Sequence, residues 1–375
     1  MRRLLLVLLA ALACCAPAPA LAAGPPTVDA RNYLVVNGKT GEVVAARGAH
    51  QRVPIASITK LMTVLVALEH AKLNDEVTVQ PVAAGVGESS VGLRAGERLT
   101  VGDLVEAALI QSANDAAYAL AAYVGGGDVG AFVRKMNAKA RKLRLRDTHF
   151  VRPDGLDAPG EYSSAADVSR LARIAMRRPE IREVVRRRSG TIAGGRVLHT
   201  WNDLLGAFPG LYGVKTGHTN GAGWCEVAAA RGRGYTIYAT ILGSPSRDER
   251  NASLAALLRW GLSRYRLTNV IATARTYALA ETGYGLAPLR LVAVSPTRHA
   301  VRVGRPLVAH VVAAAAVALP VHAGDRLGVV RVYQGKRLVG TRRLVAARTV
   351  ERPGLSGRVG FYARHTVKHV WGWFT

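Results

Sequence analysis

The chain has 375 residues, nearly half of them hydrophobic, and a formal charge of +26. Its length suits about two domains, and its hydrophobic share is sufficient for sizeable cores. The charge predicts attraction to anionic surfaces or polymers. Nucleic acid is the first candidate, but the arginines are scattered, and zinc-finger cysteines, basic-zipper heptads and an RNP-like aromatic motif are absent from the sequence, so we expect no nucleic-acid partner.

The first residues have the pattern of a secretory signal. Two arginines precede the apolar run 4–13, and small residues follow, which predicts a signal peptide over 1–22 that is cut after Ala22 or Ala23. The run is too short for a comfortable transmembrane helix. Cys14 and Cys15 leave a lipoprotein signal as a less favoured alternative, because the residues before Cys14 fit that pattern poorly.

Export changes the expected partners. Cleavage would leave Cys225 as the single cysteine, so an internal disulfide is excluded. The partners of such a protein are wall polymers and anionic lipid rather than nucleic acid. We therefore expect an exported, periplasmic protein that lies peripherally on the outer face of the cytoplasmic membrane.

The first chemistry-bearing stretch follows a predicted hairpin of strands 33–37 and 42–46. Pro54 would end an extended segment, and apolar residues then recur at helical spacing from Ser57 onward. Ser57 and Lys60 would share one face of this helix. A serine is a good nucleophile only when a base removes its proton, and a lysine is such a base when burial or a nearby cation lowers its pKa. Free N–H groups at the helix N-terminus suit an oxyanion. Taken alone, S-x-x-K is weakly specific and favours an ordinary capped helix with a solvated lysine.

The second polar cluster is Ser112-Ala113-Asn114. It follows a helix that begins near Val101, with Thr100 as its predicted cap. In an extended segment, Ser112 and Asn114 would face the same site, where a hydroxyl relays a proton and an amide binds a carbonyl. For the pattern taken alone, the favoured alternative is that one of them simply caps the next helix, over 116–123.

The third cluster, Lys215-Thr216-Gly217, is expected in a strand. A basic amphipathic helix over 128–146, a loop from 154 and a helix over 167–176 with Ser164 near its start come before it. Two apolar strands, 224–230 and 235–242, follow and indicate an antiparallel meander. Gly217 would let a ligand approach the backbone, and Lys215 would be a fixed cation that depresses the pKa of Lys60. The alternative is an edge strand with a solvated lysine.

The remainder of the chain reads as a helix, a second domain and a tail. A helix over 246–261 closes the first half. Short β-branched runs at 289–294, 300–303, 307–312, 328–333 and 336–345 predict a small all-β domain. The tail mixes aromatic and cationic residues from Val359 to Thr375, which suits an interfacial membrane anchor or, equally, an element docked on the β-domain.

The three clusters in this order resemble the motif set of the low-molecular-mass penicillin-binding proteins, the serine-type D-alanyl-D-alanine carboxypeptidases. The resemblance extends to longer stretches over essentially the whole mature chain: 57–63, 111–116, 155–157 with 162–164, and 215–219. It implies an α/β (α+β) fold of the serine penicillin-recognising transpeptidase type, an antiparallel sheet flanked by helices followed by a small all-β domain. We expect a catalytic domain over 28–265, a β-sandwich-like domain over 275–355 and an amphipathic tail over 356–375 that binds the inner-membrane surface.

The resemblance also implies the reaction and the role of each residue. The enzyme would remove the terminal D-alanine from peptidoglycan stem pentapeptides through an acyl-enzyme, bind β-lactam antibiotics covalently, need no metal or cofactor, and act in peptidoglycan remodelling and cell-shape control. Each expected role is as follows: Ser57 is the nucleophile, Lys60 the base, Ser112 the proton relay, Asn114 the amide that binds substrate and orients Lys60, Lys215 the source of positive potential, Thr216 the carboxylate ligand, Gly217 the point of close approach, His218 with Ser57 the oxyanion N–H donors, and Arg250 a second carboxylate ligand.

Other activities fit parts of this pattern. Some relatives carry an arginine near the site before residue 202, where this chain has Thr200 and Trp201, which affects substrate preference. A class A β-lactamase would need a deacylating glutamate, for which Glu161 is the loop acid available. An endopeptidase would differ only in its leaving group. The alternative that is not an enzyme is a wall-binding scaffold protein with a degenerate catalytic domain.

Overall fold

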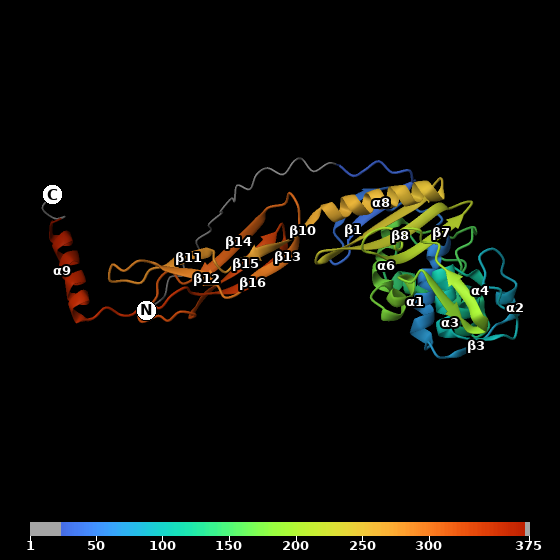
Figure 1. The fold of residues 1–375 in the computed structure, drawn as a ribbon, viewed down its shortest axis with the longest axis horizontal. Helices are drawn as coiled ribbons and strands as arrows, with labels where there is room; N and C mark the ends of the chain where they lie inside the picture. The colour runs from blue at the N-terminus through green and yellow to red at the C-terminus, as the bar shows by residue number, and fades with distance from the viewer. Residues whose placement is uncertain (1–23, 372–375) are drawn as a thin grey trace. The chain divides into compact units, whose positions relative to one another are not determined.

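The structure is a computed structural model, which describes residues 24–371. The predicted signal peptide over 1–22 therefore lies outside the described residues. The chain divides into two compact units, one of residues Ala23–Arg264 and one that begins at Tyr265 (Figure 1). The predicted site residues all lie in the first unit.

The first unit is built on a five-stranded antiparallel sheet in the order β2-β1-β9-β8-β7. The predicted meander is its larger part, since β7, β8 and β9 are consecutive in sequence and adjacent in the sheet, and the predicted N-terminal hairpin pairs through β1 with β9. The strands are β1 (Asn32–Asn37), β2 (Val43–Arg47), β7 (Leu211–Thr219), β8 (Gly223–Gly232) and β9 (Tyr235–Ser244).

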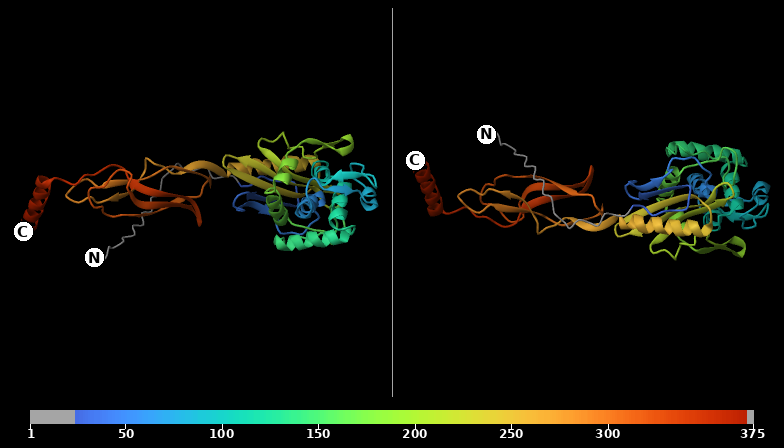
Figure 2. Two further views of the ribbon diagram at one scale, coloured as in Figure 1. Left: turned by 90° about the horizontal axis from the view of Figure 1, so that it is seen from below. Right: turned by 90° about the horizontal axis from the view of Figure 1, so that it is seen from above.

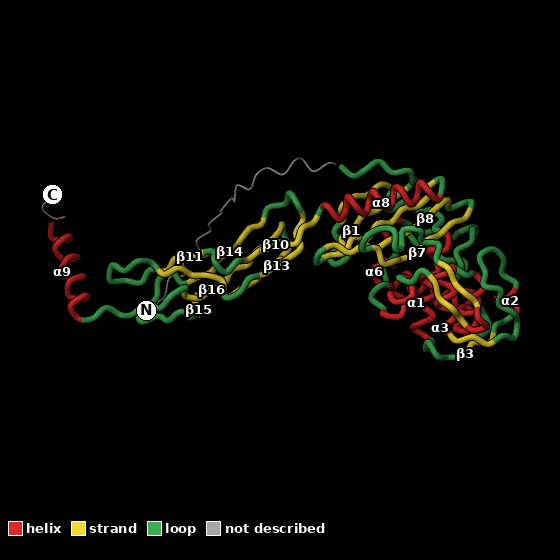
Figure 3. The backbone as a smooth tube through the Cα atoms, viewed as in Figure 1, coloured by secondary structure: helices red, strands yellow, loops and turns green. Residues whose placement is uncertain are grey.

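Helices cover both faces of this sheet. In Figure 1 and Figure 3, α8 runs along one face, and α6 with α1 lies on the other. Gly261 of α8 lets that helix approach β1 and β9 closely, because a Cβ there would lie 2.9 Å from Val35 Cγ1 and from Ile237 Cγ2. The α-helices of this unit are α1 (Lys60–His70), α2 (Pro81–Ala84), α3 (Val101–Glu106), α4 (Asn114–Val124), α5 (Val129–Lys142), α6 (Ala165–Ala175), α7 (Pro179–Val185) and α8 (Arg247–Ser263).

Polar caps fix where these helices begin. Thr100 caps α3 in a capping box with Asp103, as its position before Val101 predicts. Ser164 and Ser246 cap α6 and α8 by accepting a hydrogen bond from the backbone N–H three residues on. Two small hairpins complete the unit: β3 (Glu76–Thr78) with β4 (Arg98–Thr100), and β5 (Ser189–Ile192) with β6 (Arg196–His199).

The second unit contains the predicted small β region. Five strands form a sheet in the order β11-β12-β16-β15-β14, and β10 pairs with β13, while Figure 2 shows these strands running side by side. Their bounds are β10 (Tyr265–Ile271), β11 (Thr276–Ala280), β12 (Leu289–Ala293), β13 (Thr297–Arg302), β14 (Leu307–Ala313), β15 (Arg326–Gln334) and β16 (Arg337–Ala346). The sequence did not indicate β10 or β11, since neither contains a long β-branched run.

The tail forms a helix, α9 (Leu355–Trp371). Phe361 and Tyr362 lie edge-on to Tyr284, with ring centroids 6.0 and 6.3 Å apart, while Leu355 and Val359 are exposed. Among the described helices, none is by itself long and apolar enough to cross a membrane, and only the α4–α5 pair, bent by 90°, passes that test when taken together.

The core of the first unit gives a stability prediction. Phe132 of α5 is fully buried among apolar side chains, so Phe132→Ala should lower the free energy of unfolding by about 3–5 kcal/mol through lost burial and a cavity. Arg134→Ala, on the exposed face of the same helix, should change it by less than about 0.5 kcal/mol. Chemical denaturation of both variants measures this, and similar midpoints for both would contradict the packing described.

Candidate active site

Ser57 lies in a short turn that leads directly into α1. The turn is a 3₁₀ helix (Ala56–Thr59), and Ala56 has a left-handed backbone with φ of 50°. Ser57 is half-exposed, whereas the residues on either side of it are buried. One turn further on, Lys60 is fully buried and its Nζ lies 2.7 Å from Ser57 Oγ. The nucleophile and base that the sequence predicts are therefore in hydrogen-bond contact.

Two further oxygens surround the amine of Lys60. Its Nζ donates to Asn114 Oδ1 at 2.7 Å and to the backbone oxygen of Asp154 at 2.8 Å. Both of these atoms are acceptors only. A neutral amine, which has two N–H bonds, would donate to them and direct its lone pair at the Ser57 hydroxyl. The geometry thus prepares Lys60 to remove the Ser57 proton.

Burial tunes Lys60 for this role. Loss of hydration lowers the pKa of Lys60 from 10.5 to about 8, although the carboxylates of Asp154, Glu161 and Asp115 raise it. At neutral pH roughly a tenth of the molecules would then carry a neutral amine, compared with a negligible share for a solvated lysine. The alternative of a capped helix with a solvated lysine is therefore wrong for this chain.

The Ser112-Ala113-Asn114 segment is not an extended strand, and neither of its polar side chains caps α4. A π-helical turn (Ala107–Gln111) precedes it, Ser112 has a left-handed backbone with φ of 65°, and Asn114 already belongs to α4. No side chain caps α4, so the capping alternative is wrong, and the expectation of an extended segment is wrong as well. The strained turn still directs both side chains into one site, and such strain at a non-glycine residue is typical of functional positions.

A buried carboxylate holds this strained turn in place. Asp115, the residue after Asn114, accepts hydrogen bonds from the Val91 and Leu93 backbone N–H groups and from the Ser90 hydroxyl. The Asn114 N–H donates to the Ser89 backbone oxygen at 2.6 Å. The loop over 87–93 and the turn therefore stabilise each other.

Lys215 closes the site from the sheet side. It is buried on β7, and its Nζ donates to Ser112 Oγ at 2.8 Å and to the Thr216 backbone oxygen at 2.9 Å. Burial, with repulsion from Lys60, holds the pKa of Lys215 well below its ordinary value. Burial is the main cause of the lowered pKa of Lys60, and repulsion between the two buried amines also opposes a second charge in the site, in line with the prediction of a cation beside Lys60. The solvated-lysine alternative is wrong, although β7 is an edge strand.

Gly217 allows β7 to pass directly against the nucleophile. A Cβ at residue 217 would lie 2.9 Å from the Ile55 backbone oxygen and 3.0 Å from the Ser57 nitrogen. Thr216, one residue earlier, has a hydroxyl with no hydrogen-bond partner among residues 24–371, and is therefore free to bind a ligand. β7 is also the last strand of the sheet, so alternate N–H groups along it are not used for strand pairing.

His218 and Arg250 both lie against Trp224. The rings of His218 and Trp224 stack with centroids 4.1 Å apart, and the Arg250 guanidinium lies 5.6 Å from the Trp224 ring centroid. Arg250 is only 1% exposed, and its guanidinium contacts Glu226 Oε2 at 3.3 Å and Asp203 Oδ2 at 3.1 Å. Arg250 is therefore near the site, as predicted, but it is buried and already paired.

The position where some relatives have an arginine is filled differently. The Trp201 indole donates to the Gln111 backbone oxygen at 3.0 Å, next to Ser112, and the indole is partly exposed. Arg247 from α8 lies over the Trp201 ring at 5.5 Å and forms a bidentate pair with Asp203. The rim therefore carries a guanidinium supplied by a different element.

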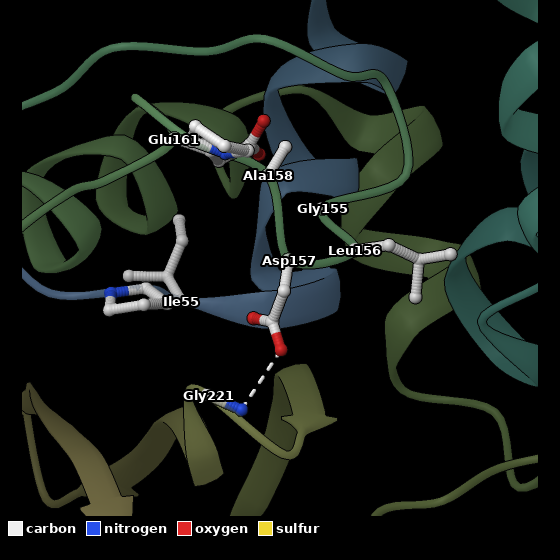
Figure 4. A pocket seen from close by; sticks show the side chains of 9 residues that line it. Ile55, Gly155, Leu156, Asp157, Ala158, Glu161 and Gly221 are labelled. Atoms are coloured by element: carbon white, nitrogen blue, oxygen red, sulfur yellow. Dashed lines mark hydrogen bonds between the residues drawn. The ribbon is translucent and has the colours of Figure 1, made fainter.

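The loop after residue 153 lines a cavity of about 320 Å³ beside the segment that enters Ser57. Asp157 joins this loop to β7 and the following turn, through Thr219 Oγ1 at 2.7 Å and the Gly221 N–H at 2.9 Å (Figure 4). Glu161 also lines the cavity, but its carboxylate accepts hydrogen bonds from the Thr59 hydroxyl and from two backbone N–H groups. Glu161 is therefore engaged in holding the loop.

The structure adds residues that sequence reasoning missed. Asp154 supplies the backbone oxygen at Lys60, and its carboxylate forms a bidentate pair with Arg152. Glu226 lies fully buried beside Arg250. The one available signal for Glu226 was a single acidic residue in an otherwise apolar strand. Within the part of the chain that the structure describes, no group of three or more His, Cys, Asp or Glu side chains could hold a metal ion.

Comparison with known proteins gives a consistent result. Residues 20–246 match the model of the D-alanyl-D-alanine carboxypeptidase family, Peptidase_S11. The D-alanyl-D-alanine carboxypeptidase DacD of Salmonella typhimurium is 30% identical over 370 residues, which is 93% of this chain and 94% of that protein.

Solved structures show the same similarity. Penicillin binding protein 6B from Escherichia coli is 29% identical, with a TM-score of 0.65 over 87% of this chain and 98% of that chain. The Streptomyces K15 DD-transpeptidase is 31% identical, with a TM-score of 0.61 over 64% of this chain and all of that chain.

The Lys60 environment predicts a pH dependence. Because Lys60 acts as a base only when it is neutral, the rate at which a neutral activated ester such as p-nitrophenyl acetate acylates Ser57 should rise with pH and level off, with an apparent pKa near 8. Lys60→Gln should lower the plateau by about a hundredfold or more. Stopped-flow acylation rates between pH 6 and 10 measure this. A rise centred near 10, or an unchanged rise in Lys60→Gln, would contradict the assignment of the base.

Proposed function

Because this chain belongs to the D-alanyl-D-alanine carboxypeptidase family and is an enzyme of that class, we propose that it acts through an acyl-enzyme on the D-alanyl-D-alanine end of peptidoglycan stem peptides. The observation that carries the proposal is the position of Lys60 Nζ, 2.7 Å from both Ser57 Oγ and Asn114 Oδ1. This is the arrangement that a lysine-activated serine needs.

Acylation begins with neutral Lys60. The amine takes the Ser57 proton, and Ser57 Oγ attacks the carbonyl carbon of the terminal peptide bond, which gives a tetrahedral oxyanion. The backbone N–H groups of Ser57 and His218 stabilise that oxyanion, each by about 3 kcal/mol. The close approach at Gly217 supports this assignment, because it brings β7 against the Ser57 backbone.

Departure of D-alanine needs a proton on its amine. Ser112 passes its hydroxyl proton to the leaving nitrogen and is reprotonated through Lys215, whose Nζ lies 2.8 Å away. Its lowered pKa makes Lys215 a better proton donor to Ser112 than a solvated lysine would be, which supports a relay rather than a purely electrostatic role. The proton that Lys60 took from Ser57 then replaces the one given up by the Ser112–Lys215 pair, which leaves Lys60 neutral again. Water attacks the ester carbonyl, and Lys60 accepts the water proton. Collapse of the second tetrahedral intermediate returns that proton to Ser57 Oγ and releases the shortened peptide.

Two side chains hold the substrate, one on each side of the scissile bond. The free hydroxyl of Thr216 binds the terminal carboxylate, and Asn114 Nδ2 binds the substrate amide in exchange for its present acceptor, the Gly87 backbone oxygen. Arg250 acts on the carboxylate through its charge rather than by contact, since its guanidinium is buried and paired.

Other reactions that use a serine acyl-enzyme are less well supported. A β-lactamase of the class A type needs a free deacylating carboxylate, whereas that of Glu161 already accepts three hydrogen bonds. Transpeptidation or endopeptidase cleavage uses the same acyl-enzyme and differs in the acceptor or leaving group; one of the similar structures is described as a DD-transpeptidase.

We further propose that the protein is exported, lies on the outer face of the cytoplasmic membrane through its C-terminal tail, binds penicillin covalently at Ser57, and remodels peptidoglycan in a way that affects cell shape. The charge of +26 supports a position at an anionic surface.

Release of D-alanine tests the reaction directly. The purified mature protein should release free D-alanine from a peptide that ends in L-Lys-D-Ala-D-Ala, and penicillin should abolish the release. Ser57→Ala should abolish both the release and covalent penicillin labelling, and Lys60→Ala should reduce labelling by about a hundredfold or more.

Thr59→Ala is the matched control, since the hydroxyl of Thr59 lies near Ser57 in sequence and, within the part of the chain that the structure describes, its hydrogen bond goes to Glu161. It should retain penicillin labelling. Full labelling of Ser57→Ala would contradict the nucleophile, and stable labelling without D-alanine release would contradict the carboxypeptidase reaction and favour another acyl transfer.

The proposed membrane contact has a separate test. Deletion of residues 356–375 should release the protein from vesicles that contain anionic lipid, because it removes the exposed apolar side chains of α9, and should leave D-alanine release unchanged. Vesicle sedimentation at two salt concentrations measures it. Equal sedimentation of the full and shortened proteins would contradict a tail anchor.

A further inference from the structure

A carboxyl group that the mechanism does not use lies directly beside the proposed carboxylate ligand. Glu226 on β8 is the register partner of Thr216 on β7. Side chains of directly opposed residues in an antiparallel pair lie on the same face of the sheet. Glu226 is fully buried there, and its Oε2 lies 3.3 Å from Arg250 Nε. Thr216, Glu226 and Arg250 thus form one polar group within the layer between β7, β8 and α8.

The surroundings of Glu226 stabilise its ionised form mainly through one ion pair, with Arg250. Neither carboxylate oxygen makes a hydrogen bond of good geometry within residues 24–371. The charged groups that face it are Arg250 from α8, Lys215 from β7 and Asp203 from the loop before β7, with the amide of Asn202 nearby. A buried carboxylate held by one ion pair and no hydrogen bond of good geometry is costly to ionise, because it lacks the hydrogen bonds that water would supply.

The charge balance at this position affects the substrate. Asp203 pairs with both Arg247 and Arg250, so Arg250 retains unbalanced positive charge only when Glu226 is neutral. The substrate carboxylate would bind at Thr216, on the same face and adjacent to Glu226. An ionised Glu226 would therefore repel the carboxylate and also neutralise the cation that attracts it.

We propose that Glu226 is a positioning residue which sets the net charge that Arg250 presents to the terminal carboxylate of the substrate, so that its ionisation weakens substrate binding. The proposal rests on the proposed carboxypeptidase function, since it concerns the same site. It makes the affinity of the enzyme for acidic peptide ends sensitive to pH in the neutral range.

The direction of this effect follows from burial. Loss of hydration, with a smaller contribution from Asp203, raises the pKa of Glu226 from 4.5 to about 7, against the opposing effects of Arg250, Lys215 and Asn202. Below this pH Glu226 is neutral and KM should be low; above it Glu226 is ionised and KM should rise. The substrate carboxylate stays ionised throughout. Deprotonation of Lys60 should instead speed acylation as the pH rises. The effect of Glu226 should therefore appear in KM, and the effect of Lys60 in the rate of the chemical step.

The test compares KM as a function of pH for the full-length mature enzyme and three variants. With a peptide that ends in D-Ala-D-Ala, wild-type KM should rise about tenfold between pH 6 and pH 8.5. Glu226→Gln, which mimics the neutral acid, and Glu226→Leu should keep KM near the low-pH value across the range. Glu249→Gln, which makes the same charge change at an exposed position one residue before Arg250, should follow the wild type.

A substrate without a carboxylate provides the second measurement. Acylation of Ser57 by neutral p-nitrophenyl acetate should have the same rate and pH profile in Glu226→Gln as in the wild type. The proposal is overturned if KM in Glu226→Gln retains the wild-type pH dependence, or if the variant slows ester acylation as much as peptide turnover, which would indicate a structural role. Absence of penicillin-sensitive D-alanine release from the wild type would instead refute the proposed function.

Discussion

The site depends on removing one amine from water. Lys60 is the first residue of α1, in the core of the first unit, and among residues 24–371 its Nζ forms hydrogen bonds with three oxygens, from Ser57, Asn114 and Asp154. Burial lowers the pKa of Lys60 to about 8, so a residue that is ordinarily a cation becomes a base near neutral pH. The rest of the site supplies the two fixed acceptors that orient this amine toward the nucleophile.

Steric constraints bring the parts of the site together. Gly217 lets β7 pass against the Ser57 backbone, and Gly155, with φ of 82°, lets the loop from 153 do so from another side, where a Cβ would lie 2.1 Å from the Ala56 backbone oxygen. The left-handed backbone of Ser112 turns its hydroxyl toward Lys215. The left-handed conformation of Ser112 is costly in isolation, and the buried Asp115 carboxylate helps to hold the turn in place. Gly155 and Gly217 carry no such cost, because glycine has no Cβ.

Electrostatics at the site are balanced rather than simply positive. Lys60 and Lys215 cannot both remain charged in a dry site without strong repulsion, and the pKa values of both are lowered. Arg250 is flanked by Asp203 and Glu226, so its attraction for an anionic ligand depends on the ionisation of Glu226. Although the whole chain is strongly cationic, the net positive charge that this site offers to an anionic ligand therefore depends on Arg250 and on the ionisation of Glu226.

The sequence by itself determined the order of elements and the identity of the reacting groups. Helical periodicity, polar caps such as Thr100 and the apolar runs of the meander predicted most elements correctly, because these signals are local. Ser57, Lys60 and Lys215 were assigned because the three motifs that contain them, in this order, resemble the set of one family, whereas each motif alone is weakly specific. Tertiary structure alone decided the backbone of Ser112, the burial of Arg250 and the position of Glu226. These depend on contacts between residues far apart in the chain, which local pattern does not encode, and pKa values follow burial, which exists only once the chain is folded.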